Sequence, residues 1–334
     1  MNVLEASHCA IGIEEIAVAL PTVAVDNRAI VEKHGFDAEF IEKKLGIGSR
    51  WRLSEDDSVS AMAGRAVDAL FDSSETSRDA VELIVVVTQT PDYCMPGVAT
   101  LIQHASGLPR TAAAFDVGLG CSGYVYGLAI ARGMMMAEGF STGVLVTADA
   151  YSRIMTDDDR ATSPLFGDAA SATLLSRSPR YHLSRGVFGS DGAGATSLIA
   201  RGTGSKVEAR EPLFMNGRAI YEFMMTEAPA SVMALLEQEE MTLDDVDAFV
   251  FHQASRFMLE SLAKSLKLQP ERLVVEMSDV GNTTSSSIPI ALKRRIIDAA
   301  PTPPRVLLSG FGVGLSWASV LLSAQSHGVE VTNV

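Results

Sequence analysis

Cysteine is scarce in this sequence, with Cys9, Cys94 and Cys121 the only three among 334 residues. Their odd number and irregular spacing fit neither a disulfide framework nor a zinc site, which needs closely spaced ligands. The sequence therefore predicts a protein of a reducing, cytoplasmic compartment with no metal site. Each thiol is left free for packing or for chemistry.

Long apolar runs and a basic N-terminal leader are also lacking. The apolar stretch from Ile11 to Leu20 is interrupted by Glu14 and Glu15, and no segment approaches the ~20 apolar residues of a membrane span. Basic residues are outnumbered, because 27 Lys and Arg face 41 Asp and Glu, for a formal net charge of −14. Binding to phosphate backbones needs a basic surface, so we do not expect nucleic acid binding. Because no long apolar run is present, we do not expect membrane insertion either.

Buried strands and intervening helices are indicated by the apolar pattern. Apolar residues make up 47% of the chain, which is typical of a globular protein with one large domain or two fused halves. Four short apolar runs are bounded by turn residues, and stretches of helical period lie between them. These runs are Glu82–Val87, Gly143–Val146, Ala248–Phe251 and Arg305–Leu308. The alternation predicts a layered α/β fold.

A faint internal duplication relates the two halves of the chain. Phe166–Ser176 resembles Phe311–Ser323, and Val81–Gln89 resembles Val246–Gln253. The repeat is half a protein long, whereas stacked modules repeat every ~20 to 50 residues. We therefore predict an N-terminal half over residues 1–175 and a C-terminal half over residues 176–334. The polar, glycine-rich segment Ser190–Ser205 is interpreted as a surface loop or as the join between the halves.

Cys121 ends an apolar run in the stretch Phe115–Gly123, and an uncharged helical pattern follows over Tyr124–Ala131. Such a strand–turn–helix places the thiol at the positive end of a helix dipole, which favours a nucleophilic thiolate. The pattern indicates covalent chemistry through a thioester. Burial of Cys121 as a small core residue is the alternative.

His252 stands out among the six histidines because it follows a strong apolar strand and opens a helical pattern. Ligand sites of α/β proteins usually lie beyond the carboxyl ends of strands. The helical pattern buries one apolar side and places three basic residues on the opposite arc. The apolar residues are Leu259, Leu262, Ala263 and Leu266, and the basic ones are Arg256, Lys264 and Lys267. A histidine in the core is the alternative interpretation.

Two glycine turns in the C-terminal half complete the set of candidate elements. In Gly281–Pro289, Asn282 precedes a small polar run and an apolar helix. Its amide is able to donate to a developing negative oxygen or, alternatively, to cap the helix. The cluster Gly310–Trp317 allows close backbone approach and a main-chain N–H aimed at a thioester oxygen.

Over nearly the whole chain, these elements resemble the thiolase superfamily and, within it, the β-ketoacyl-acyl carrier protein synthase III branch. The matching motifs are GCSG at Cys121, HQA at His252, GNTTSSS at Asn282 and FGVGLSW from Phe311. The resemblance implies a duplicated thiolase-like fold with αβαβα layers. Neighbouring classes are disfavoured, because Gly310 replaces the second thiolase cysteine and Asn282 replaces the second histidine of chain-elongating synthases. The glutamate of hydroxymethylglutaryl-CoA synthases is absent from the segment Val87–Thr90.

The resemblance implies catalysis by Cys121, His252 and Asn282. Cys121 would take an acyl group from an acyl-CoA, with the N–H groups of Cys121 and Gly314 stabilising the oxyanion. His252 and Asn282 would bind a malonyl thioester and hold the enolate left after loss of carbon dioxide. The product would be a β-ketoacyl thioester, and no cofactor is implied.

Further roles follow from the same resemblance. Substrate or CoA contacts are expected at Phe40, Lys44, Arg160, Gly217 and Met95. Met95 would enter the acyl pocket of a neighbouring subunit, which implies a homodimer. An acidic acyl carrier protein would dock on Arg256, Lys264, Lys267 and Arg218.

Two alternatives remain open at the level of sequence. In the first, the same acyl-cysteine transfers its group to a hydroxyl, amine or aromatic acceptor. In the second, the chain is a non-catalytic partner subunit. The second is disfavoured because Cys121, His252 and Asn282 are all present. FGVG in place of FGGG and the segment Thr90–Cys94 depart from the fatty-acid enzyme, so a specialised pathway is also open.

Overall fold

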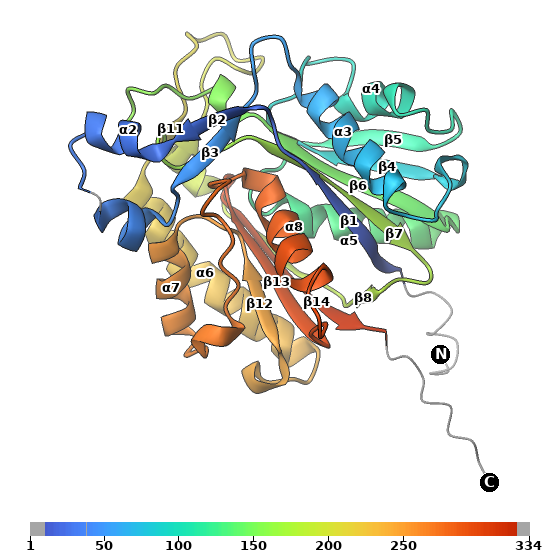
Figure 1. The fold of residues 1–334 in the computed structure, drawn as a ribbon. Helices are drawn as coiled ribbons and strands as arrows, with labels where there is room; N and C mark the ends of the chain where they lie inside the picture. The colour runs from blue at the N-terminus through green and yellow to red at the C-terminus, as the bar shows by residue number, and fades with distance from the viewer. Residues whose placement is uncertain (1–10, 38, 326–334) are drawn as a thin grey trace.

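Ten strands form one continuous hydrogen-bonded sheet in the computed structural model, which describes residues 11–37 and 39–325 (Figure 1). In spatial order they are β12 (Ala248–Phe251), β13 (Arg305–Gly312), β14 (Ser316–Ala324), β8 (Tyr181–Leu183), β1 (Gly12–Ala19), β7 (Ala169–Ser176), β6 (Thr142–Asp149), β4 (Leu83–Val87) and β5 (Ala113–Val117), with β9 (Val187–Ser190) on β14. All four strands predicted from apolar runs are confirmed, as β4, β6, β12 and β13.

The pairing pattern occurs twice along the chain. Strand β4 runs parallel to β6, which is antiparallel to β7. In the second half, β12 runs parallel to β13, which is antiparallel to β14. The resembling segments of the sequence therefore occupy equivalent places, and the duplication is visible in the sheet. The boundary after residue 175 stays a prediction.

Helices cover and separate the two halves of the sheet (Figure 1). Helices α3 (Val59–Asp72) and α4 (Val98–Ala105) pack on the outer face of β4, β6 and β7. Helices α5 (Gly123–Glu138) and α8 (Ser287–Leu292) lie between the halves and share one buried apolar cluster with both. Helices α6 (Gly217–Gln238) and α7 (Arg256–Ser265) cover β12 and β13 from outside. These are the five αβαβα layers that the resemblance implies.

Smaller elements surround the carboxyl ends of β5 and β12. They are β2 (Val23–Asp26), β3 (Ser49–Arg52), β10 (Leu198–Ile199), β11 (Phe214–Met215), α2 (Asn27–Lys33) and a π-helical turn over Phe40–Leu45. The segment Ser190–Ser205 is more than a surface loop, because it contains β10 and its Leu198 is buried. Within residues 11–37 and 39–325, no helix has the length and apolar character needed to cross a membrane.

Candidate active site

Cys121 lies between the end of β5 and the first turn of α5, as the strand–turn–helix pattern predicts. Glycines permit this position, because a Cβ on Gly312 would lie 2.6 Å from the Cβ of Cys121. A Cβ on Gly123 would lie 2.4 Å from a methyl group of Val87. Real Cβ atoms do not approach so closely, so glycine is required both in the turn that carries the thiol, at Gly123, and at the end of β13, at Gly312.

Burial governs the acidity of this thiol. It raises the pKa of Cys121 to about 12, and the charge of Asp149 acts in the same direction. Hydrogen bonds to the sulfur from the main-chain N–H groups of Cys121 and Val313 oppose the rise only in part. The thiolate expected from the helix dipole is therefore not favoured in the free site, because desolvation outweighs the dipole.

His252 follows β12 and is neutral in the free site, because burial lowers its pKa to about 3. Its Nδ1 lies 2.7 Å from the hydroxyl of Ser287. That hydroxyl accepts the N–H of Gln253 at 3.4 Å, so its own proton is available for Nδ1. With the Ser287 proton donated to Nδ1, the ring proton lies on Nε2, and His252 is a hydrogen-bond donor on its other side.

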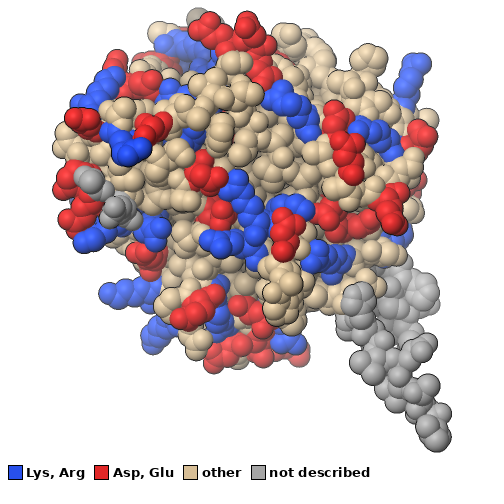
Figure 2. Space-filling view, viewed as in Figure 1, with Lys and Arg blue, Asp and Glu red and all other residues tan. Residues whose placement is uncertain are grey.

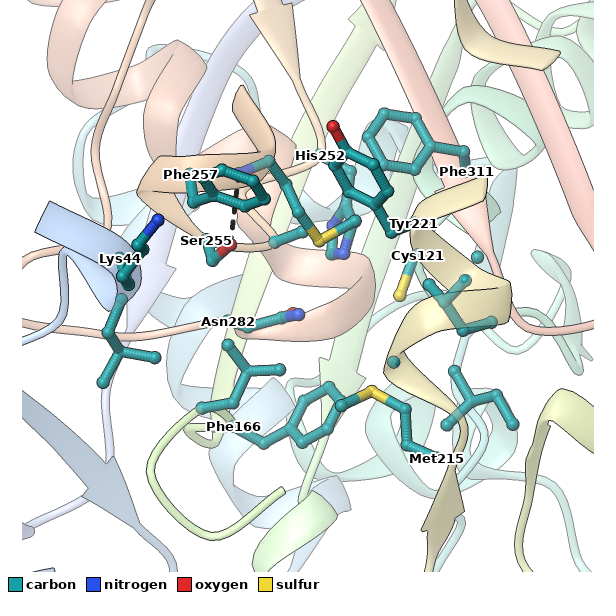
Figure 3. A pocket seen from close by; sticks show the side chains of 18 of the residues that line it. Lys44, Cys121, Phe166, Met215, Tyr221, His252, Ser255, Phe257, Asn282 and Phe311 are labelled. Atoms are coloured by element: carbon teal, nitrogen blue, oxygen red, sulfur yellow. Dashed lines mark hydrogen bonds between the residues drawn. The ribbon is translucent and has the colours of Figure 1, made fainter. Parts of the chain in front are cut away.

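Asn282 is fixed by its main chain and by its side-chain oxygen. Its N–H donates to the carbonyl of Leu165 and its carbonyl accepts from Gly167, each at 3.0 Å. Its Oδ1 accepts the N–H of Thr284 at 3.0 Å. Because the oxygen is engaged in this turn, the NH₂ group is the end of the amide available to the site. Figure 3 shows the thiol of Cys121, the ring of His252 and the amide of Asn282 pointing into one space.

Asp149, at the end of β6, holds the turn that carries Asn282 and was not anticipated from the sequence. Its carboxylate accepts the N–H of Gln89 at 2.8 Å, the Thr284 hydroxyl at 2.7 Å and the Ser285 hydroxyl. Burial raises the pKa of Asp149 to about 6 against these hydrogen bonds. Thr284 has a φ of 50°, a conformation uncommon for a non-glycine residue, and Asp149 restrains it.

A cavity of about 460 Å³ opens from the three residues toward the surface. Its wall is mainly apolar and comes from α6, α7, β10, β11 and the turn Phe40–Leu45. Lining residues include Phe40, Lys44, Leu165, Phe166, Leu198, Met215, Gly217, Ile220, Tyr221, Phe257, Met258 and Phe311. The ring of Phe311 stands edge-on to His252, with the ring centroids 5.7 Å apart. Such a cavity suits an apolar acyl chain.

The expected contact residues divide between the cavity and the surface. Phe40, Lys44 and Gly217 line the cavity with the three catalytic candidates. Arg160 instead is exposed and lies over the ring of Phe36. Met95 is 80% exposed and is not part of the cavity wall.

Val313 takes the place in which Gly314 was expected. The second main-chain N–H at the Cys121 sulfur belongs to Val313, and Gly314 does not line the cavity. The direction of each N–H in a glycine turn depends on backbone angles, which the motif does not reveal.

The four basic residues of the expected docking surface lie on or beside α6 and α7. Lys264 and Lys267 are exposed, Arg256 is partly buried and lies 3.8 Å from Glu260, and Arg218 is paired with Glu222 at 2.8 Å. Figure 2 shows both signs of charge mixed over the visible face of the molecule. The two arginines are thus partly neutralised within their own helices, and the two lysines are the better available cations.

Several residues that shape the site escaped the sequence interpretation. Ser287 and Thr284 lie within the GNTTSSS motif, but only the fold shows that they orient His252 and Asn282. Within the part of the chain described by the structure, no group of three or more His, Cys, Asp or Glu side chains is arranged to hold a metal ion.

Comparisons with known proteins agree on one family. The family model described as 3-oxoacyl-[acyl-carrier-protein (ACP)] synthase III matches residues 115–192, and its C-terminal model matches residues 236–324. The β-ketoacyl-[acyl-carrier-protein] synthase III of Streptococcus pyogenes serotype M5 (strain Manfredo) is 33% identical over 93% of this chain and 98% of its own length.

Solved structures give the same result. The 3-oxoacyl-(acyl-carrier protein) synthase from Burkholderia xenovorans LB400 is 32% identical with a TM-score of 0.87, covering 94% of each chain. The priming β-ketosynthase of the R1128 polyketide biosynthetic pathway is 27% identical with a TM-score of 0.85, covering 95% of this chain and 97% of that one. The chain therefore has the thiolase fold and belongs to the 3-oxoacyl-[acyl-carrier-protein] synthase III family of acyl-transferring condensing enzymes.

Proposed function

We propose that the chain carries out a priming condensation in which Cys121 accepts an acyl group and passes it to a malonyl thioester. The observation that carries this proposal is the convergence of Cys121, His252 and Asn282 at the inner end of one apolar cavity (Figure 3). Membership of the family supports the same reaction.

In the first step, the Cys121 sulfur attacks the carbonyl carbon of an acyl-CoA. The carbonyl oxygen becomes negative and is placed to accept the N–H groups of Cys121 and Val313, which already face the sulfur. The thioester bond to CoA breaks, the acyl–sulfur bond to Cys121 forms, and the thiol proton leaves with CoA. Since burial holds Cys121 as a neutral thiol, its proton departs only as the acyl donor arrives.

In the second step, His252 and Asn282 bind the thioester carbonyl of the malonyl group. Loss of carbon dioxide leaves an enolate, whose oxygen accepts from Nε2–H of His252 and from the Asn282 amide. The enolate carbon attacks the acyl carbon, the bond to the Cys121 sulfur breaks, and the sulfur takes up a proton. The reaction requires no cofactor, because the two donors hold the negative charge.

The partners and the location belong to the same proposal. An acyl carrier protein would dock beside α7, where Lys264 and Lys267 are exposed. A homodimer is supported by the exposed apolar residues Tyr93 and Met95, which are 59% and 80% exposed. An exposed free thiol at Cys94 suits a reducing cytoplasm.

Intact-protein mass spectrometry tests the reaction. The chain is incubated with a panel of acyl-CoAs and then with a malonyl carrier thioester, with Cys121→Ala as the control. We expect an acyl adduct that the variant lacks and that malonyl thioester discharges with release of carbon dioxide. Discharge only by a hydroxyl, amine or aromatic acceptor would replace the condensation with another acyl transfer, and no adduct from any donor would overturn the acylation step.

A further inference from the structure

Arg50, in β3, is a charged residue buried behind the wall of the cavity. Its side chain is fully buried, yet it does not line the cavity. Burial lowers the pKa of Arg50 to about 10, so it remains a cation at neutral pH. Because a buried charge is costly unless hydrogen bonds compensate it, the contacts of its guanidinium group indicate what this residue holds in place.

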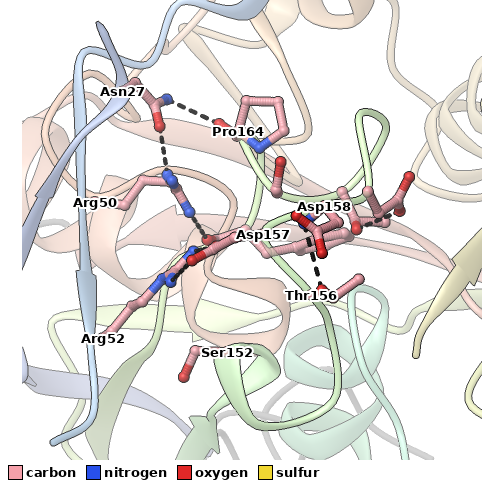
Figure 4. Close-up of polar contacts among 12 residues, drawn as sticks. Asn27, Arg50, Arg52, Ser152, Thr156, Asp157, Asp158 and Pro164 are labelled. Atoms are coloured by element: carbon pink, nitrogen blue, oxygen red, sulfur yellow. Dashed lines mark hydrogen bonds and ion pairs between the residues drawn. The ribbon is translucent and has the colours of Figure 1, made fainter. Parts of the chain in front are cut away.

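The guanidinium group joins two segments that are far apart in the chain. Its Nε donates to Oδ1 of Asn27 at 2.7 Å, and its Nη1 donates to the carbonyl of Phe166 at 2.9 Å. Asn27 in turn donates from Nδ2 to the carbonyls of Pro164 at 2.8 Å and Ile47 at 2.9 Å. Figure 4 shows Asn27 between Pro164 and Arg50, so the two side chains hold the chain before β7 as one unit.

The segment that they hold also pairs with Asn282. Leu165 accepts the N–H of Asn282, and Gly167 donates to its carbonyl, each at 3.0 Å. Phe166 lies between these two residues, lines the cavity and accepts from Arg50. A movement of this segment would therefore move the main chain of Asn282 with it.

The stem of Arg50 contacts the turn that precedes Asn282. A Cβ on Gly281 would lie 2.8 Å from Cγ of Arg50, and Gly281 has a φ of 75°. This position therefore requires glycine. The main chain just before β3 reaches the same turn, because the N–H of Gly48 donates to the carbonyl of Ser278 at 2.8 Å. Arg50 thus contacts both of the segments whose pairing fixes Asn282.

We propose that Arg50, held by Asn27, is a positioning residue for Asn282 and therefore for the condensation step. Because Arg50 does not line the cavity, it acts on the substrate only through the Asn282 amide. A displacement of about 1 Å is enough to lower a reaction rate about 10²-fold, so a smaller shift of this donor is already felt. Acylation of Cys121 does not use the amide. This inference rests on the proposed function for the reaction that it affects.

The kinetic test measures the two steps separately in Arg50→Met, which keeps a stem against Gly281 and removes both guanidinium hydrogen bonds. The rate of carbon dioxide release from the pre-acylated enzyme at saturating malonyl thioester should fall about tenfold. Acylation of Cys121 should change less than threefold. Equal losses in the two steps would contradict the inference, and so would an unaltered rate of carbon dioxide release.

A double-mutant cycle identifies the group through which Arg50 acts. Once alanine replaces Asn282, no amide is left to position. Adding Arg50→Met to Asn282→Ala should therefore lower the remaining condensation rate less than twofold. A further tenfold loss in the double variant would show that Arg50 acts independently of Asn282 and would overturn the inference.

Arg132→Met is the matched control. Arg132 is a half-buried arginine that also donates to main-chain carbonyls, those of Leu183 and Ser184, and it lies outside the cavity wall. Both steps should stay within about twofold of wild type in this variant, and a selective tenfold loss of condensation would contradict the inference. Melting temperatures report whether each variant is folded. If Arg50→Met does not fold, Asn27→Ala takes its place, because it removes the acceptor of the guanidinium group and the donor to Pro164.

Hydrogen exchange separates this inference from the proposed function, because it requires no substrate. The N–H groups of Gly167 and Asn282 should exchange at least about tenfold faster in Arg50→Met than in the wild type, and at the wild-type rate in Arg132→Met. Unchanged exchange of both amides in Arg50→Met would overturn the inference. Faster exchange in that variant, together with a wild type that releases no carbon dioxide from malonyl thioester, would overturn the proposed function alone.

Discussion

The hydroxyl of Ser287 lies 2.7 Å from Nδ1 of His252 and thereby joins the first turn of α8 to the residue that follows β12. Both residues are buried. Because Ser287 engages one ring nitrogen, it determines which nitrogen carries the proton at the cavity. Ser287 is a positioning residue, since it acts on the substrate only through His252.

Removing this hydroxyl should impair the condensation more than the acylation. In Ser287→Ala the tautomer of His252 is no longer fixed, and a buried acceptor loses its partner. We expect about a tenfold fall in the rate of carbon dioxide release, with acylation of Cys121 changed less than threefold. Rapid-quench measurement of the two steps checks this.

Ser231→Ala is a matched control for that variant. Ser231 is also a buried serine on a helix, and its hydroxyl lies 2.8 Å from that of Ser319, away from the cavity wall. Equal losses of condensation in the two variants would mean that Ser287 serves stability alone.

The amide of Asn282 should be required as a donor and not merely as a turn residue. Asn282→Asp keeps the shape and the oxygen that accepts from Thr284 but places a carboxylate oxygen where the enolate needs an N–H. We expect condensation to fall by about 10²-fold or more, while the acyl adduct on Cys121 still forms. Loss of the adduct itself would show that Asn282 acts in the first step.

The reactivity of Cys121 should increase with pH as expected for a buried thiol with a raised pKa. Because burial raises its pKa to about 12, the thiolate fraction grows about tenfold for each pH unit from pH 7 to pH 10. Alkylation of the free enzyme by iodoacetamide, followed by peptide mapping, should increase in this proportion without a plateau. A plateau near neutral pH would show that the helix dipole dominates after all. Cys94, which is exposed, serves as an internal reference for reagent activity.

The contribution of Asp149 to the free energy of unfolding should fall as the pH rises. Burial raises its pKa from 3.8 to about 6, so the folded state binds the proton more tightly than the unfolded state. The stability it contributes is full below pH 3.8 and is lost as the pH rises through 6.

Asp149→Asn removes that dependence while keeping an oxygen for Gln89. From pH 5 to pH 8, the free energy of unfolding of the variant should increase relative to wild type by about 1 kcal/mol. Urea denaturation at the two pH values measures it. A difference in the free energy of unfolding between variant and wild type that stays constant or shrinks from pH 5 to pH 8 would contradict the raised pKa of Asp149.

The sequence predicts the positions of the catalytic candidates well, because each depends on a local pattern. Cys121 ends a strand before a helix, and His252 follows an apolar strand. The four predicted strands are confirmed for the same reason, since buried strands are continuous apolar runs.

Features that depend on non-local packing could not be predicted in this way. The Val313 N–H, the restraint of Thr284 by Asp149 and the contact of Arg50 with Phe166 join segments that are distant in the chain or depend on backbone angles. The acidity of Cys121 was expected from the helix dipole, whereas it is decided by burial, which only the assembled fold reveals.

The most direct test of the central claim is a single turnover of the pre-acylated wild-type enzyme with malonyl thioester labelled in its free carboxyl group. We expect one labelled carbon dioxide and one β-ketoacyl thioester for each acyl group that leaves Cys121. Loss of the acyl group without release of label, or release of label without loss of the acyl group, would contradict the account, because decarboxylation and transfer from Cys121 would then be separate reactions.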